Sequence, residues 1–209
     1  MNDTAASADH RSRLLDALTL VLTDRAYSEV TIADIVARAR VSRRTFYEQF
    51  EIKDACLLAL CERLSEQILG LIAAGYDPMA DWVEQLNRVT DTYLQALQMQ
   101  PTLVRTLYIE LMQLGAAGLA VRRRISQRFA MFLIMQVELA RLREPGKRSL
   151  SPALATAIVG GVNELILQAV EEGRADRQDF RPVLLRLQGG PAGPRRFRQA
   201  AALGRRRGC

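Results

Sequence analysis

Four arginines lie within seven positions of the chain, at Arg38, Arg40, Arg43 and Arg44. A guanidinium can donate two parallel hydrogen bonds to O6 and N7 of guanine, which discriminates between bases by about 1–3 kcal/mol. Hydroxyl and ammonium groups beside them suit phosphate oxygens, which position a protein on the duplex. The side chains expected to contact phosphate are Ser42, Thr45, Tyr47 and Lys53. Paired arginines on a helix are more often only a solvated face, so the interpretation depends on the elements that carry them.

The first of these elements is a short helix that begins after Thr31. Thr31 and Asp34 have the spacing of a capping box, in which each side chain bonds a free backbone N–H of the first turn. Apolar residues then recur at helical spacing and give the helix one buried face. These residues are Ile32, Ile35, Val36 and Ala39.

A second helix begins after Ser42, which is a favourable N-cap residue. Val41 and Phe46 have the spacing of a hydrophobic staple around that cap. Only residues 39–41 remain for the turn, so the two helices must cross steeply.

Successive helical residues are about 100° apart, which places Arg43, Arg44 and Tyr47 on one arc and Phe46 on the opposite side. Arginines in the first turn of such a helix reach base edges when the helix lies in the major groove. The agreement of caps, staple, turn length and basic cluster predicts a DNA-binding helix-turn-helix over residues 31–50.

The same residues resemble the TetR family of bacterial transcriptional regulators. The resemblance runs through VTIADIVARARVS, SRRTFYEQF and KDACLLAL, including the aromatic pattern of Phe46, Tyr47 and Phe50. One departure is Arg40, which stands where the family usually has glycine; a left-handed conformation there costs a non-glycine residue about 1 kcal/mol or more. The sequence does not decide between a different turn and an added phosphate contact at this position. The resemblance implies that DNA is contacted by Thr31, Arg43, Arg44, Thr45, Tyr47 and Lys53.

Composition favours an all-α fold, because 49% of the 209 residues are hydrophobic and the chain shows little strand alternation. The net charge of +6 does not itself indicate DNA binding. Eight arginines and no acidic residue lie in 181–209, and the remaining chain holds 21 basic and 23 acidic residues. No apolar run approaches the length of a membrane span, and the amino terminus has no signal core. We therefore expect a cytoplasmic protein that has no membrane partner.

Catalytic and metal-ligating residues are few. His10 is the single histidine, and we expect it in a mobile segment ahead of the first helix. Cys56 and Cys61 are expected to pack in the core, and Cys209 is terminal. This inventory favours neither a zinc site nor histidine-based catalysis, so we expect no metal, no cofactor and no enzymatic activity.

The patterning predicts a helix-turn-helix domain at 10–56, a larger helical ligand-binding and dimerisation domain at 57–188, and a disordered basic tail at 189–209. After a first helix at 10–26, long helices are expected at 55–74, from Asp77-Pro78 to Met99, at 102–114, at 116–142 and at 152–173. Gly75 and Gly115 are expected to end the helices before them. The tail can add non-specific affinity for phosphate.

The helix expected at 152–173 carries an apolar stripe that is wider than one neighbouring helix needs, although an ordinary core helix is the alternative. Gly160 and Gly161 would let another helix approach closely. The TetR resemblance implies that this helix pairs with a second subunit, together with a short helix at 180–187. The residues expected at the dimer interface are Leu154, Ile158, Gly161, Val162, Leu165, Ile166 and Ala169.

The resemblance also implies a pocket in the body for a small apolar or amphipathic ligand. Its expected lining is Trp82, Tyr93, Tyr108, Met112, Phe129 and Phe132, and nearby polar candidates are Gln98, Gln113, Gln136 and Glu110. The preferred hypothesis is a homodimeric repressor that ligand releases from a palindromic, double-stranded DNA operator. The alternative is a ligand-independent DNA-binding regulator or architectural protein with a filled core.

Overall fold

The structure is a computed structural model that describes residues 2–77, 80–99, 104 and 106–171. Within these residues every regular element is a helix, so the predicted all-α fold is confirmed. No described helix has the length and apolarity needed to cross a membrane. The helix expected at 180–187 and the tail at 189–209 lie outside the described residues.

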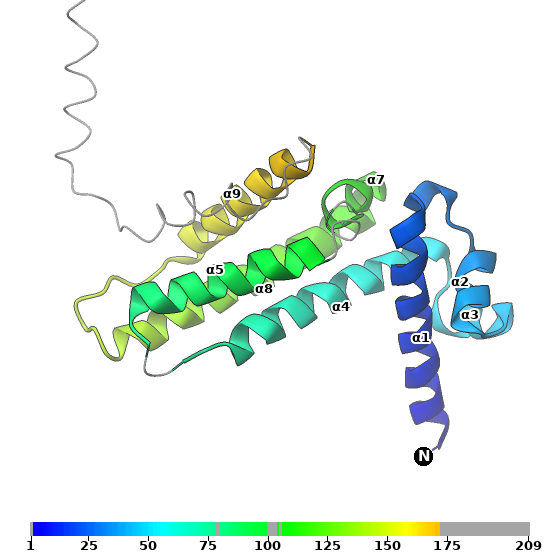
Figure 1. Cartoon of the computed structure of the whole chain (residues 1–209), viewed down its shortest axis with the longest axis horizontal. Coiled ribbons are helices and arrows are strands. Elements are labelled where there is room, and N and C mark those ends of the chain that lie inside the picture. Colours follow the sequence, from blue (N-terminus) through cyan, green and yellow to red (C-terminus); the bar gives the residue numbers. More distant parts are fainter. Residues whose placement is uncertain (1, 78–79, 100–103, 105, 172–209) are drawn as a thin grey trace, which may run out of the picture.

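The amino-terminal part consists of α1 (Asn2–Asp24), the short 3₁₀ helix η1 (Tyr27–Glu29), α2 (Ile32–Ala39) and α3 (Arg43–Gln49). Figure 1 shows α2 and α3 beside the length of α1. The helix α1 begins eight residues before the predicted start, because no glycine or proline interrupts the segment. His10 therefore lies in a helix, and the expected mobile segment was wrong.

Both predicted helix starts are confirmed by hydrogen bonds. Thr31 Oγ1 accepts from the Asp34 N–H at 3.2 Å, and Asp34 Oδ2 accepts from the Thr31 N–H at 2.9 Å. The hydrogen bonds that the Asp34 carboxyl accepts from the Thr31 hydroxyl and backbone N–H, and then the nearby Arg25, lower the pKa of that carboxyl. At α3, Ser42 Oγ accepts from the Thr45 N–H at 3.0 Å. The sequence therefore defines the beginning of each motif helix through local bonds.

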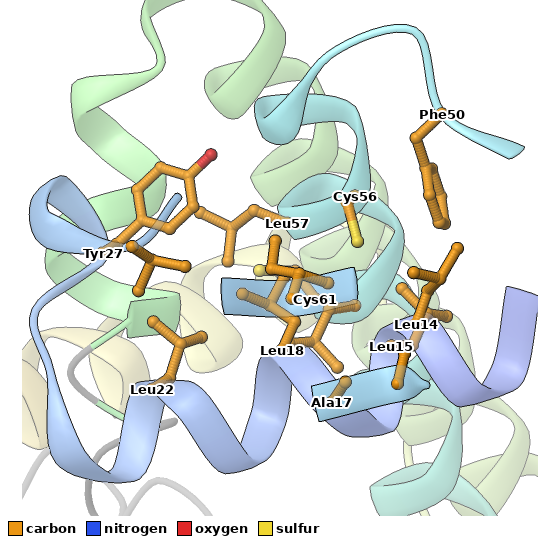
Figure 2. Close-up of a cluster of buried hydrophobic side chains, with 14 of the residues drawn as sticks. Leu14, Leu15, Ala17, Leu18, Leu22, Tyr27, Phe50, Cys56, Leu57 and Cys61 are labelled. Atoms are coloured by element: carbon orange, nitrogen blue, oxygen red, sulfur yellow. The ribbon is translucent and has the colours of Figure 1, made fainter. Parts of the chain in front are cut away.

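One apolar core joins α1, α2, α3 and the first half of α4 (Lys53–Ala74). Figure 2 shows side chains of α1 meeting Tyr27, Phe50 and residues of α4. Cys56 and Cys61 lie in this core with exposed fractions of 0% and 1%, as predicted. Burial raises the pKa of each thiol to about 12, so both remain protonated and unreactive at neutral pH.

The body is formed by the rest of α4 together with α5 (Trp82–Met99), α8 (Gly115–Arg141) and α9 (Pro152–Glu171). The helix α4 runs from the amino-terminal part into the body, where α5, α8 and α9 lie above it in the view of Figure 1. Ion pairs also join α8 to α4, at 2.8 Å between Arg124 and Glu62 and at 2.6 Å between Arg128 and Glu66.

Two predicted boundaries in the body differ from the structure. The helix α5 begins at Trp82 rather than after Asp77, because Asp81 Oδ1 accepts from the Glu84 N–H at 2.8 Å and caps it. The helix expected at 102–114 contains a π-helix, η2 (Thr106–Glu110), followed by a single turn, α7 (Leu111–Gln113). Gly115 has the left-handed φ of 60° expected after a helix, yet α8 begins at this same residue.

Candidate DNA-binding surface and ligand cavity

The outward face of α3 carries the side chains that the sequence assigned to DNA. Arg43 and Arg44 are exposed, and 57% of Tyr47 is exposed. Phe46 is fully buried on the opposite side of the helix. Arg44 Nε donates to Glu48 Oε1 at 3.0 Å, but the pair lies in solvent and leaves other guanidinium N–H groups free to reach a base.

The hydroxyls around this face also serve the caps of the two helices. Thr31 and Ser42 each accept a backbone N–H, and Ser42 Oγ lies 2.9 Å from Thr45 Oγ1. These side chains are held at the edge of the motif by the same bonds that begin the helices. Their expected contacts with phosphate remain predictions.

Lys53 has a structural role that the sequence did not indicate. Its Nζ donates to the carbonyl oxygens of Tyr27 and Val30 at 3.0 and 2.7 Å. It also lies 4.2 Å from the centre of the Tyr27 ring, which is a cation–π distance. Lys53 thus ties the start of α4 to the segment before α2, and one of its three N–H donors remains for the predicted phosphate contact.

The turn between the motif helices excludes the different backbone conformation that was one alternative for Arg40. Its φ and ψ of 55° and 47° are left-handed, so it adopts the conformation that favours glycine. Arg13 of α1 donates to the carbonyl oxygens of Ala39 and Arg40 at 2.7 and 3.0 Å. These carbonyls have no partner within α2, and the guanidinium of Arg13 satisfies them.

A second arginine of α1 acts in the same way at the end of α3. Arg11 donates to the carbonyl oxygen of Gln49 at 3.3 Å, and its guanidinium lies 4.5 Å from the Phe50 ring centre. The two arginines bond the carboxyl ends of both motif helices to α1. This arrangement fixes how α3 is presented to solvent, and sequence reasoning missed it because the contacts span 26 to 38 residues.

Replacing Arg40 with glycine should stabilise the protein by about 0.5–1 kcal/mol. Glycine removes the steric cost of the left-handed conformation. This gain exceeds the free-energy cost of the greater conformational entropy that glycine gives the unfolded chain. Arg38→Gly is the matched control, since Arg38 has helical geometry inside α2 and glycine there should destabilise by about 1 kcal/mol. Urea unfolding followed by circular dichroism measures both changes, and equal losses of stability would contradict the strain assigned to Arg40.

The body contains a cavity of about 760 Å³ between α4, α5, α8 and α9. Its wall is mainly apolar, and its volume is that of a site for a drug-sized or lipid-like molecule. Four of the six side chains predicted to line a pocket line this one: Trp82, Tyr93, Phe129 and Phe132.

A few polar side chains also line this cavity. Gln136 is 8% exposed, and its Oε1 has no hydrogen-bond partner in the described structure. Lys147 and Arg148, in the loop before α9, also line the cavity. The ammonium of Lys147 pairs with Glu144 at 2.6 Å and lies 4.9 Å from the centre of the Trp82 ring. The loop residues gave no sequence signal, because their place beside the cavity depends on how α8 and α9 pair.

The two other predicted pocket residues lie elsewhere. Tyr108 lines a smaller adjoining cavity of about 50 Å³ and not the large one. Met112 lies on α7, is 36% exposed, and does not line the large cavity. Among the polar candidates, Gln113 is exposed, while Glu110 is buried against the amino-terminal part; the side chain of Gln98 lies outside the described residues.

The residues predicted for a dimer interface divide into two groups. Leu154 is 53% exposed and Gly161 is open to solvent, whereas Ile166 is only 2% exposed. Ile166 packs in its own chain against Leu94, Leu97 and Val104, so its side chain does not lie on the exposed face of α9. Ile158, Val162 and Leu165 are half-buried, and the side chain of Ala169 lies outside the described residues.

An exposed helix-turn-helix, held on a separate helical body with an apolar cavity, defines a DNA-binding transcription regulator. Residues 14–60 match the family model of bacterial regulatory proteins of the tetR family. No curated protein matches the chain significantly in sequence.

Solved structures share the fold over most of the chain. The regulator FadR from Bacillus subtilis, in complex with stearoyl-CoA, is 19% identical over 84% of this chain and 96% of its own, with a TM-score of 0.70. FadR from Bacillus halodurans is 19% identical over 88% and 96%, with a TM-score of 0.72. A regulatory protein TetR from Rhodobacter sphaeroides is 24% identical over 83% and 96%, with a TM-score of 0.63. Residues 14–60 are thus similar to the DNA-binding domain of tetR-family regulators, and most of the chain shares the fold of these solved structures.

Proposed function

We propose that the protein is a homodimeric repressor that binds a palindromic operator and is released when an amphipathic molecule occupies the cavity. The observation that carries the proposal is the large apolar cavity in a body connected by α4 to the motif. The same cavity argues against the alternative of a ligand-independent protein with a filled core.

The exposed face of α3 supports sequence-specific binding. Arg43 and Arg44 lie in its first turn, the part of a recognition helix that reaches base edges. Thr31, Ser42, Thr45, Tyr47 and Lys53 surround them and supply contacts to phosphate.

Replacing Arg43 and Arg44 together with alanine should weaken specific DNA binding by about 1–3 kcal/mol per lost base contact. A duplex selected from a random pool with the wild-type protein provides the target, and fluorescence anisotropy gives the affinity. Arg123→Ala is the matched control, because Arg123 is an exposed arginine on α8 and is not part of the helix-turn-helix. Unchanged affinity of the double variant would remove the role assigned to these arginines. A selected site without two half-sites about 34–36 Å apart would contradict the dimer on a palindrome.

Exposed apolar and small residues on α8 and α9 support the dimer. Met131 and Met135 on α8 are 66% and 50% exposed. At Gly160 and Gly161 on α9, an added Cβ would meet nothing within 4 Å. A second subunit packed on these two helices would cover the methionines and use the glycines for close approach.

The ligand chemistry follows from the wall of the cavity. Apolar side chains suit an alkyl chain or ring system, while Lys147 and Arg148 at the loop suit an anionic group. FadR from Bacillus subtilis, whose fold is similar, is described in complex with stearoyl-CoA, which joins an acyl chain to an anionic head group. A ligand of that kind is consistent with both parts of this wall.

Filling the cavity should abolish ligand binding. Val89→Trp places an indole into the space, whereas Val83→Trp changes a residue of the same helix that is 51% exposed and is not part of the wall. Stearoyl-CoA and free stearate serve as the probes. Their binding is measured by thermal shift and by release of the selected duplex. Stabilisation and release in wild type and Val83→Trp, but not in Val89→Trp, is the expected result. Absence of any effect of either probe on the wild type would reject an acyl ligand.

A further inference from the structure

The π-helix η2 and the turn α7 after it connect two of the apolar clusters in the described part of the chain, one in the body and one in the amino-terminal part. Tyr108 of η2 packs against the body cluster that contains Leu94, Leu97 and Ile166. Leu111, at the start of α7, is 1% exposed and belongs to the core of the amino-terminal part. Only two residues, Ile109 and Glu110, thus lie between a contact with the body and a contact with the DNA-binding domain.

On the side of the body, Tyr108 is the middle of a short chain of hydrogen bonds. Its hydroxyl donates to Asn163 Oδ1 at 3.0 Å and lies 3.1 Å from the hydroxyl of Tyr93. Because a phenol has one proton to donate, the Tyr93 hydroxyl is the donor to Tyr108. Tyr93 and Asn163 both line the large cavity, so a molecule in it can reach either end of this chain.

On the side of the DNA-binding domain, Glu110 makes a buried contact with η1. Its Oε1 accepts from the Tyr27 backbone N–H at 3.0 Å, across 83 residues of sequence. The Tyr27 hydroxyl donates to Asp54, and Lys53 holds the Tyr27 carbonyl oxygen. The segment that precedes α2 is therefore held from one side by η2 and from the other by the first turn of α4.

The π-helical geometry gives this connection two possible arrangements. The hydrogen bonds of a π-helix span five residues where those of an α-helix span four, and π-helical turns occur often at functional sites. Conversion of η2 to regular α-helix would shift its residues by one position, or about 100° around the axis. Tyr108 and Glu110 could not then both keep their present partners.

We infer that Tyr108 and Glu110 are the positioning residues through which the cavity acts on the helix-turn-helix. A ligand oxygen that accepts the proton of Tyr93 competes with Tyr108 and weakens the hydrogen-bond chain. The ligand class is therefore an apolar molecule with a hydrogen-bond acceptor, such as a carbonyl or carboxylate, that reaches Tyr93. Release of η2 then loosens the hold of Glu110 on Tyr27 and changes how α2 and α3 are presented. This inference rests on the proposed ligand-responsive function.

The proposed route from Tyr108 through Glu110 to Tyr27 can be tested without a known ligand, by measuring hydrogen exchange of the Tyr27 amide in the full chain. Tyr108→Phe keeps the ring and removes the hydroxyl, and we expect the Tyr27 amide to exchange about tenfold faster. Tyr76→Phe is the matched control, because Tyr76 lies outside this chain of bonds and should leave the rate unchanged. The Leu60 amide, in the core of α4, reports global unfolding in every variant. An unchanged Tyr27 rate in Tyr108→Phe would overturn the inference.

Two substitutions of Glu110 establish the other end of the connection. Glu110→Gln keeps an oxygen acceptor and should preserve the slow exchange of Tyr27, whereas Glu110→Met removes the acceptor and should accelerate it about tenfold. Equal rates in these two variants would show that the carboxyl does not protect this amide, and would overturn the assignment of Glu110.

Loss of the hydrogen bond that Tyr93 donates to Tyr108 can be imitated by Tyr93→Phe, with Tyr76→Phe as its control. We expect faster Tyr27 exchange in Tyr93→Phe and no additional change when Tyr108→Phe is present in the same chain. Additive effects of the two substitutions would overturn the proposed route. A wild-type protein that binds no DNA would reject the proposed function. The exchange rates would still show whether Tyr108 and Glu110 control the protection of the Tyr27 amide.

Discussion

Phe46→Ala is expected to destabilise the protein by about 3–5 kcal/mol, a large part of the stability of a domain of this kind. Phe46 is fully buried, and its ring centre lies 5.6 Å from that of Tyr47 and 5.8 Å from that of Phe50. Truncation leaves a cavity in a core that α3 shares with α1, α2 and α4. Because α3 has only seven residues, its packing and not its intrinsic propensity keeps it helical.

Tyr47→Ala is the matched control, since the neighbouring ring is 57% exposed and faces the proposed DNA surface. Its unfolding free energy should change by no more than about 0.5–1 kcal/mol, while its affinity for the selected duplex should fall. Urea unfolding followed by circular dichroism, together with anisotropy, separates the two effects. A loss below about 1 kcal/mol in Phe46→Ala would mean that the core does not depend on this ring.

The helix-turn-helix could be predicted in detail because its determinants are local. The capping box of Thr31 with Asp34 and the cap at Ser42 are interactions over three residues, and both are present in the structure. The opposite orientations of Phe46 and Arg43 follow from helical periodicity alone. The caps and the orientations of these side chains can therefore be predicted without knowledge of the rest of the fold.

The predictions failed where distant contacts decide the structure. The hydrogen bond from Tyr27 to Glu110 and the bonds from Arg13 to the turn join residues that are far apart in sequence. Ile166 lies on the expected apolar stripe, yet it is buried because α9 packs against η2 and α5. An apolar pattern shows that a face is covered but does not identify what covers it.

Arg40 shows how the long-range contacts act on a local conflict. The sequence places a costly residue in the turn, and the structure keeps the left-handed conformation. The hydrogen bonds from Arg13 to the carbonyls of this turn compensate part of that cost. A rigid presentation of α3 then depends on α1 as well as on the motif, which explains why the DNA-binding domain needs its first helix.

Gly118→Ala is expected to destabilise the protein by about 1–3 kcal/mol or more, because it forces an atom into a packed backbone. A Cβ at Gly118 would lie 1.9 Å from the carbonyl oxygen of Leu111 and 3.2 Å from Cβ of Leu114. The first atom belongs to the backbone of α7, so no side-chain rotation can relieve the contact. The turn α7 must move away from α8, and Leu111 must leave its place in the core of the DNA-binding domain.

Gly70→Ala provides the matched control for this change. Gly70 lies within α4, where an added Cβ would meet nothing within 4 Å, so alanine should stabilise the helix by about 1 kcal/mol. Urea unfolding should therefore give opposite signs for two identical substitutions. Since α7 directly follows η2, Gly118→Ala should also accelerate exchange of the Tyr27 amide, whereas Gly70→Ala should not. Stability gained in both variants would contradict the close approach of α7 to α8, and with it the fixed position of η2 between the cavity and the DNA-binding domain.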